Sequence, residues 1–277
     1  MHVAQIWQYP VKSLIGHTVA AATLDTTGIV GDRQWALRDV ASGNLANCRQ
    51  TPGIMRLAAR SSADGVEIAL PDGCLVRSSA DDADTLLSAA LGTEVRLESL
   101  RPADDLDYYR RSPTNMPDPM AHLRGIFGRD DDEPLPDFAK FGPAVLEFDS
   151  PPGTFYDCYP LLVMSTSALR SMTEAVPDSV IDVRRFRPSF VVDTGDEPGH
   201  PEFGWEGRRF AVGTAVIEVI NDCPRCAAIT KEIDDATPAD RAILRHVVRD
   251  LGQAVGVYCA VVQPGIFHVG DTFTEIS

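Results

Sequence analysis

The chain has 277 residues, which is enough to bury a large core in one big domain or two smaller ones. Acidic residues outnumber basic ones 40 to 25, so the formal net charge is -15 at pH 7. That charge disfavours partners whose binding depends on neutralising phosphates, and we expect neither nucleic acid nor an anionic membrane surface as a partner. An acidic exterior can still enclose a basic pocket that binds a phosphorylated small ligand.

Gly and Pro number 21 and 20, which is typical of a chain with many turns and short strands. The N-terminus has no basic stretch followed by an apolar one, and no run of roughly 18 uncharged apolar residues occurs. We therefore expect a cytoplasmic protein that does not enter a membrane. In that compartment cysteines are better interpreted as thiols than as a disulfide framework. The six are Cys48, Cys74, Cys158, Cys223, Cys226 and Cys259.

Short runs with the composition of β-strands fill the first hundred residues. They cover residues 3–7, 19–24, 34–40, 54–60 and 66–70. Each ends at a turn signal such as TTG, ASGN, SADG or PDG, which favours antiparallel hairpins in a small barrel or sandwich over βαβ units. Residues 81–92 combine an acidic start, apolar positions at helical spacing and a terminal Gly, so they predict a short helix before a strand at 94–100.

Residues 101–142 are rich in Pro and Asp, and they show neither a helical nor a strand period. We interpret this segment as a long loop or lid. A solvated linker is an equally open interpretation. On the functional interpretation, the segment shapes the entrance to a site.

The second half predicts another β structure with a few covering helices. Residues 165–176 predict a helix after a buried strand, and residues 239–251 predict an amphipathic helix with one apolar face. The strand-like runs are 144–148, 160–165, 208–222, 257–262 and 267–276. We therefore predict an α+β protein that is mainly β with a few helices.

The CPRC tetrapeptide at residues 223–226 is the sharpest local feature. Two thiols separated by two residues can chelate a metal, form a reversible disulfide, or leave one thiolate as a ligand. A structural zinc site needs a second pair of soft ligands, and the other cysteines stand alone. A thioredoxin-like pair normally lies at a helix N-terminus, whereas both flanks here look like strands. Two core cysteines remain a third interpretation, although Arg225 beside a thiol favours the thiolate.

Basic residues near strand ends form a second set of candidates. In YPVKS, a rigid proline precedes Lys12 and Ser13, and a cation beside a hydroxyl suits a phosphate. The arginines are Arg33 in GDRQW and Arg184, Arg185 and Arg187 in VRRFRPSF. The alternative for these side chains is an ordinary surface or a local ion pair, for example with Asp32 or Asp182.

Several common enzyme classes lack their usual sequence support. The six histidines are widely spaced without an HExxH or paired pattern, which argues against a histidine-bound zinc or non-haem iron. The sequence contains no GxSxG, Walker A or strand-linked GxGxxG motif. Serine hydrolase, P-loop NTPase and Rossmann interpretations are weakened accordingly.

Five short motifs occur in a specific order, namely YPVKS, GDRQW, FRPSFVV, CPRC followed by a Thr, and PGIFHVGD. Their order, which spans almost the whole chain, resembles the MOSC family. The pattern is most similar to its two-part group with an N-terminal β-barrel region, which includes the mitochondrial amidoxime reducing component and bacterial YcbX-type proteins. The resemblance implies that residues 1–120 form the N-terminal β-barrel region and residues 121–277 the MOSC β-barrel domain.

The resemblance also implies a molybdenum cofactor bound between the two halves, with one protein cysteine on the metal and no need for pyridoxal phosphate. The family position of that cysteine corresponds to Cys226, which becomes both the metal ligand and the catalytic residue. A soft thiolate suits the metal, and Arg225 can stabilise an anionic cofactor. The implied cofactor contacts are Lys12, Ser13, Arg33, Asp157, Cys158, Arg187, Pro224, Arg225 and Tyr258.

Two positions depart from the family pattern. Cys158 and Pro224 stand where relatives commonly have Ser or Thr, so a side-chain hydroxyl contact is lost at each. A CxxxxCxxC ferredoxin segment is also absent from the sequence. Electrons are therefore expected from a separate protein of the reductase, ferredoxin or cytochrome type.

The implied function is the reduction of small N-hydroxylated compounds, such as amidoximes, N-hydroxylated bases or hydroxylamines, at a Cys226-ligated molybdenum. An alternative from another class is a carrier that delivers the cofactor, or delivers sulfur held as a persulfide on Cys226. A family member without any cofactor is a third possibility, which the substitutions at Cys158 and Pro224 leave open.

Overall fold

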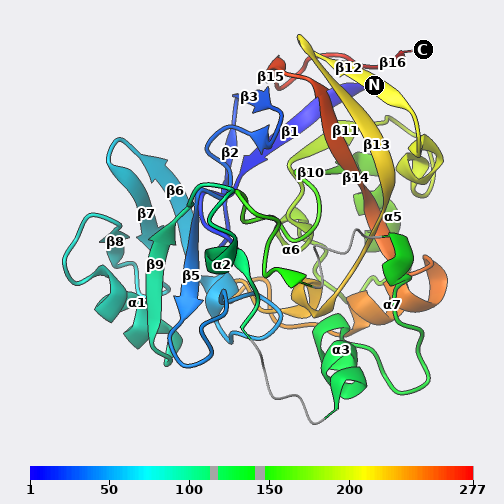
Figure 1. Cartoon of the computed structure of the whole chain (residues 1–277). Coiled ribbons are helices and arrows are strands. Elements are labelled where there is room, and N and C mark those ends of the chain that lie inside the picture. The colour runs from blue at the N-terminus through cyan, green and yellow to red at the C-terminus, as the bar shows by residue number, and fades with distance from the viewer. Residues whose placement is uncertain (113–117, 141–146, 277) are drawn as a thin grey trace.

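A computed structural model describes residues 1–112, 118–140 and 147–276 of the chain. Its main element is an eight-stranded sheet, in which the first strand of the chain lies beside a strand of the second half (Figure 1). The order is β16 (Phe273–Ile276), β12 (Arg209–Val212), β13 (Ala215–Pro224), β14 (Ala254–Gln263), β10 (Leu161–Ser165), β11 (Phe190–Asp193), β1 (His2–Gln8) and β2 (His17–Val19).

The two sides of this sheet curl towards each other. A single bridge joins His2 to Thr272, and the backbone N–H of Phe273 donates to the carbonyl of Met1 at 2.9 Å. Within the described residues no continuous ladder closes the curl into a complete barrel. Strands take up about 34% of the chain and helices about 23%, which confirms the prediction of a mainly β fold with a few helices.

Strict alternation along β13 explains how the sheet is filled. Ala215, Ile217, Val219, Asn221 and Cys223 are buried, while the residues that alternate with them are half-buried, because successive side chains of a strand point to opposite faces. The first three of these pack in the core of the large sheet. Cys223 therefore points inward at the end of the strand.

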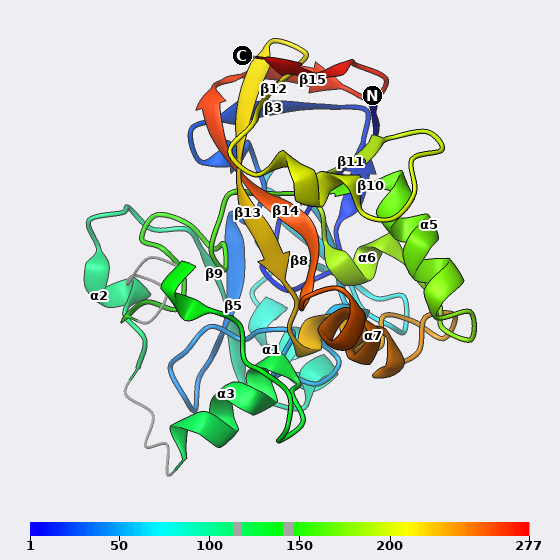
Figure 2. The ribbon, with the colours of Figure 1, turned by 90° about the vertical axis from the view of Figure 1, so that its right-hand side faces the viewer.

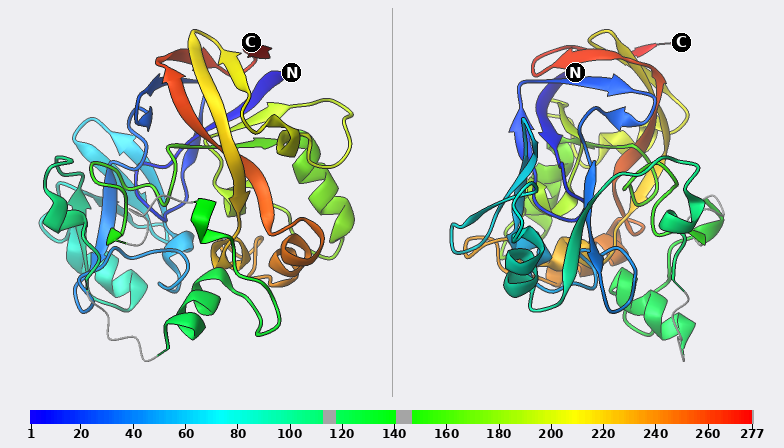
Figure 3. Two further views of the ribbon diagram at one scale, coloured as in Figure 1. Left: turned by 45° about the vertical axis from the view of Figure 1, so that its right-hand side comes forward. Right: turned by 60° about the vertical axis from the view of Figure 1, so that its left-hand side comes forward.

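The N-terminal part forms small antiparallel sheets beside the large one (Figures 1 and 3). Its own core also contains Ala228 and Ile233 from the second half of the chain. The elements are β3 (Ala21–Asp25) and β4 (Gly28–Ile29) with β15 (Gly265–His268), β5 (Trp35–Asp39) with β9 (Val95–Ser99), and β6 (Ala58–Ser62), β7 (Gly65–Ala69) and β8 (Leu75–Arg77), with α1 (Ala83–Leu91).

Three helices cover the other side of the large sheet, where they form a third core (Figure 2). They are α5 (Thr166–Ala175), α6 (Val183–Phe186) and α7 (Ala242–Asp250). The apolar face predicted for α7 is confirmed, since Ile243, Leu244, Val247 and Val248 are buried. In the part of the chain that the structure describes, no helix has the length and apolarity needed to cross a lipid bilayer.

The segment interpreted as a loop is more structured than predicted. It contains α2 (Leu106–Tyr109), α3 (Pro119–Phe127) and the short 3₁₀ helix η2 (Phe138–Lys140), whereas residues 113–117 and 141–146 lie outside the described chain. At the start of α3 the Asp118 carboxylate accepts from the backbone N–H of Met120 and Ala121, both at 3.0 Å. This cap, with a proline in the first turn, accounts for a helix without an obvious apolar period.

Two other expectations about local structure are wrong. Residues 54–56 form the 3₁₀ helix η1 (Ile54–Arg56) after Gly53, whose φ of 74° turns the chain, so the strand begins only at Ala58. The chain after CPRC forms the 3₁₀ helix η4 (Ala227–Thr230) and not a strand. The predicted strand at 144–148 falls partly on residues outside the described chain.

Glu202, in the 3₁₀ helix η3 (Pro201–Trp205), is an acidic residue that is buried inside the protein. Burial raises the pKa of its fully buried carboxyl, although a 2.5 Å hydrogen bond from Ser165 opposes the shift. A raised pKa means that stability is greatest below the unfolded value of about 4.3 and falls as the pH rises through the folded pKa. We expect Glu202→Gln to raise the melting temperature at pH 7 by about 2–4 °C and to flatten its pH dependence in calorimetry.

The matched control is Glu197→Gln, because Glu197 is an exposed residue of the same region. Its melting temperature should follow that of the unmodified protein at every pH. A Glu202→Gln protein that melts earlier than the unmodified protein at pH 7 would contradict the assignment of a buried, destabilising charge.

Candidate functional site

A cavity of about 730 Å³, including the part open to solvent, lies between the N-terminal part and the large sheet. All ten site residues that the family resemblance implies line it, although they come from six separate segments of the chain. They are Lys12, Ser13, Arg33, Asp157, Cys158, Arg187, Pro224, Arg225, Cys226 and Tyr258. The fold therefore brings the predicted residues together, while their roles remain a prediction.

Three of these residues have a strained backbone. Ser13, Arg33 and Arg187 adopt left-handed conformations with φ of 69°, 47° and 58°. Such conformations are uncommon outside glycine and tend to cluster at functional sites, where the surrounding structure enforces them. In the described chain only one other non-glycine residue does so, Gln253, with φ of 74°, and its carbonyl accepts from the backbone N–H of Arg225 at 2.8 Å.

Two guanidinium groups meet at the ring of Tyr9. Those of Arg187 and Arg33 lie 4.4 and 5.2 Å from its centroid. Arg33 makes the ion pair with Asp32 that the sequence suggested, whereas Arg187 has no carboxylate partner among the described residues. Burial and the charge of Arg33 lower the pKa of Arg187, which shows that this positive charge is poorly compensated. The pocket therefore has an excess positive charge that suits an anion.

Arg225 adds another cation without a carboxylate partner in the described chain. Its side chain donates to the carbonyl of Phe186 at 2.7 Å and to the Sγ of Cys223 at 3.1 Å. Its guanidinium also lies 5.5 Å from the centroid of the Phe186 ring. These contacts fix the side chain of Arg225 inside the protein, where it is buried beside the cavity.

The other two arginines of VRRFRPSF have structural partners. Arg184 pairs with Asp182, as the sequence suggested, and also with Asp234 at 2.8 Å. Arg185 is fully buried and its guanidinium donates only to backbone carbonyls, among them that of Lys231 at 2.9 Å. Arg184 does not line the cavity, whereas Arg185 lies at its wall.

Lys12 is buried and already has three acceptors within the protein. Its Nζ donates to Asp157 at 2.7 Å, to the carbonyl of Phe155 at 3.0 Å and to the hydroxyl of Ser150 at 3.2 Å. Burial raises the pKa of Asp157, but Lys12 and Arg49 lower it further, so the carboxyl stays ionised. The three donors of the Lys12 ammonium group are therefore occupied within the protein. Lys12 contributes to the pocket by its positive charge and by holding the carboxylate of Asp157 in place.

Four thiols line the cavity, and they differ in exposure. Cys48 and Cys223 are buried, whereas Cys158 and Cys226 are partly exposed. Burial, with the nearby charge of Asp157, raises the pKa of Cys158 to about 12, so it stays a neutral thiol at physiological pH. In the described chain these side chains form no group of three or more that could hold a metal ion. Cys226 is the other partly exposed thiol, and its role as the metal ligand stays a prediction.

Tyr258 lies on β14 at the wall of the cavity, where its ring packs against Tyr159 with centroids 5.0 Å apart. Burial raises the pKa of the Tyr258 hydroxyl well above its ordinary value, so it remains a neutral hydrogen-bonding group. Tyr159 is one of several lining residues that the sequence did not indicate. Cys48 also lines the cavity, and Arg49 pairs with Asp157 at 3.6 Å. Neither belongs to a recognisable motif, and only the tertiary fold brings them to the site.

Family models match both halves of the chain. The MOSC N-terminal beta barrel domain matches residues 1–109, and the MOSC domain matches residues 150–274. The predicted division at residue 120 stays a prediction.

The curated relatives include mitochondrial amidoxime reducing component 2 of Bos taurus and of Macaca fascicularis. They are 24% and 23% identical to this chain, and the alignments cover 97% of the chain and 81% and 82% of the relatives. Among solved structures, the YUAD protein from Bacillus subtilis is 10% identical, with a TM-score of 0.48 over 99% of this chain and 93% of that protein. The two family models, in the order that the sequence motifs predicted, show that the chain belongs to the MOSC family.

Proposed function

We propose that this protein binds a molybdenum cofactor in the cavity, with Cys226 as the protein ligand to the metal, and reduces N-hydroxylated compounds. The MOSC family is associated with binding of this cofactor. The observation that carries the proposal is the half-buried thiol of Cys226 in the same cavity as Arg187 and Arg225, two cations without carboxylate partners in the described chain.

The donor set of the cavity fits such a cofactor. A thiolate is a soft ligand that suits molybdenum, and a pyranopterin with its phosphate is an anion that needs positive charge. Arg33, Arg187 and Arg225 would hold the anion, and the hydroxyl of Tyr258 offers a neutral donor. Burial raises the pKa of Cys158 to about 12, and a neutral thiol is a weaker ligand than a thiolate.

When bound, the cofactor would supply a centre that exchanges two electrons. The overall reaction is RNHOH + 2e⁻ + 2H⁺ → RNH₂ + H₂O, in which the N–O bond breaks and the oxygen leaves as water. We propose that the electrons come from a separate donor protein, as the names of the relatives, components of an amidoxime-reducing system, suggest. The residues of this chain would bind and orient the reactants.

The direct test replaces the proposed ligand. We expect Cys226→Ala to lower the molybdenum content of protein made in a cofactor-competent host by at least about tenfold, because the thiolate that attaches the metal is gone. Reduction of an amidoxime with a reduced viologen as donor should fall in parallel. Metal analysis and amidine formation are the two measurements.

Cys74→Ala is the matched control, since Cys74 is exposed and lies outside the cavity. It should keep the metal and the activity of the unmodified protein. An unmodified protein that contains no molybdenum would contradict the proposal. A persulfide on Cys226 in that protein, seen by mass spectrometry, would instead support the carrier function.

A second test concerns the uncompensated charge. We expect Arg187→Met to lower retention of the molybdenum cofactor by at least about tenfold, because a charge-assisted contact to the anion is lost. Its melting temperature without cofactor should not fall, because repulsion from Arg33 is relieved. Cofactor content after dialysis and thermal denaturation are the measurements.

The control is Arg184→Met three residues earlier, where the guanidinium pairs with two carboxylates outside the cavity. This variant should keep the cofactor while its melting temperature drops. If the two variants lose cofactor equally, the role of Arg187 in binding the anion is refuted.

A further inference from the structure

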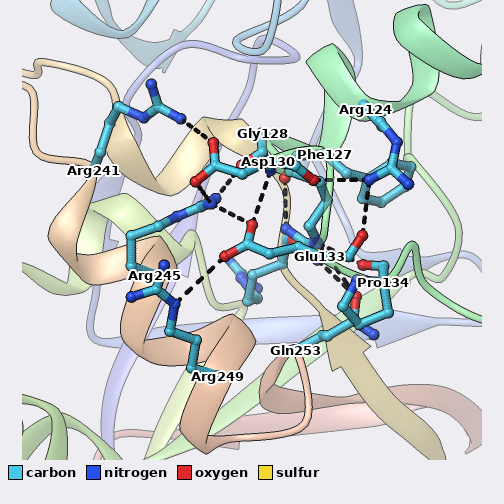
Figure 4. A network of polar contacts seen from close by, with 12 residues as sticks. Arg124, Phe127, Gly128, Asp130, Glu133, Pro134, Arg241, Arg245, Arg249 and Gln253 are labelled. Atoms are coloured by element: carbon cyan, nitrogen blue, oxygen red, sulfur yellow. Dashed lines mark hydrogen bonds and ion pairs between the residues drawn. The ribbon is translucent and has the colours of Figure 1, made fainter.

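The segment of residues 124–134, which joins the end of α3 to the following loop, contacts the chain on both sides of Cys226. The sequence offered only a loop or linker here. In the structure the segment lies against both η4 and α7, and a network of charged side chains holds it there (Figure 4). We refer to it below as the clamp segment.

Arg129 makes the contact on the N-terminal side of Cys226. It is 6% exposed, and its Nη2 donates to the carbonyl of Arg225 at 3.0 Å and to the Oε1 of Gln253 at 3.0 Å. Its other donors bind the carbonyls of Phe127 at 2.6 Å and Pro134 at 3.2 Å. The planar guanidinium thus ties four acceptors together in one place.

Gly128 makes the contact on the C-terminal side. Its φ is 61°, and a Cβ built on it would lie 3.3 Å from the Cβ of Ala227 and 2.8 Å from the Cδ2 of Leu244. A side chain at this position would therefore press on the residue that follows Cys226 and on α7. Arg129 therefore holds the carbonyl before the cysteine, and Gly128 packs closely against the residue after it.

A charged network attaches the clamp segment to α7. Asp130 accepts from Arg245 at 2.7 Å and from Arg241 at 3.0 Å, and Glu133 pairs with Arg245 and with Arg249 (Figure 4). Glu133 is buried, whereas the side chain of Arg241 is 72% exposed. The pairs around Glu133 therefore contribute more to the attachment than the exposed pair of Arg241 does.

We propose that the clamp segment positions Cys226 for the metal, with Arg129 as the positioning residue that holds the carbonyl of Arg225. This inference rests on the proposed function, because it assumes that Cys226 is the ligand. It assigns a specific role to a segment outside both family models, since residues 124–134 lie between their matched ranges. Arg129 need not touch the cofactor for this role.

The test compares Arg129→Lys with Arg129→Met in the full-length protein. Lysine keeps the charge but cannot reach four acceptors in the plane of a guanidinium, so both variants should behave alike. We expect amide hydrogen exchange of residues 225–230 to become at least about tenfold faster in both. In loaded protein, the electron paramagnetic resonance signal of pentavalent molybdenum should broaden, because the position of the Cys226 sulfur becomes heterogeneous.

Arg241→Lys is the matched control, because it alters an arginine at the exposed end of the same network. Its exchange in residues 225–230 and its resonance signal should stay within about twofold of the unmodified protein. Gly128→Ala is a second variant, which should reproduce the faster exchange without changing any charge. It keeps the test decisive if an Arg129 variant does not fold.

Each outcome has a distinct meaning. Faster exchange and a broadened signal in Arg129→Lys support the clamp. An Arg129→Lys protein that retains molybdenum and matches the unmodified protein in both measurements overturns the clamp but leaves the proposed function intact. Unmodified protein without molybdenum overturns the proposed function, and with it the role assigned to the clamp.

Discussion

Two buried arginines hold the backbone around Cys226, and both bind carbonyl oxygens instead of carboxylates. Arg129 donates to the carbonyl of Arg225, and Arg185 donates to those of Ile229 and Lys231 at 3.3 and 2.9 Å. A guanidinium that donates to backbone carbonyl oxygens holds the backbone in place, and no carboxylate neutralises its positive charge. The short loop that carries the thiol is therefore fixed at both ends, and the interior around it stays positive in a chain of net charge -15.

The position of this loop also depends on all parts of the fold. Ala228 packs into the core of the N-terminal part, while Ile229, the next residue, packs into the core formed by α5, α6 and α7. Cys226 precedes both residues, and Cys223 anchors the end of β13. A change in how the parts pack would therefore move the thiol relative to Arg33, which comes from the N-terminal part.

The sequence was sufficient for the strand-rich fold, and its ordered motifs indicated ten of the residues that line the cavity, whose roles stay a prediction. β13 illustrates the first point, since its pattern also places Cys223 inward. The η4 helix was missed because four residues show no helical period, and α3 was missed because a cap rather than an apolar face starts it. Arg129 and Cys48 could not be recognised, since their partners lie far away in sequence and only the fold brings them together.

X-ray absorption at the molybdenum edge tests the central claim most directly, because it counts the sulfur atoms bound to the metal. The comparison is between the unmodified protein and Cys226→Ser, each loaded with cofactor. If Cys226 is the ligand, the sulfur shell of the unmodified protein contains one more sulfur than that of the variant. An identical sulfur shell in the two proteins would contradict the assignment of Cys226 as the ligand.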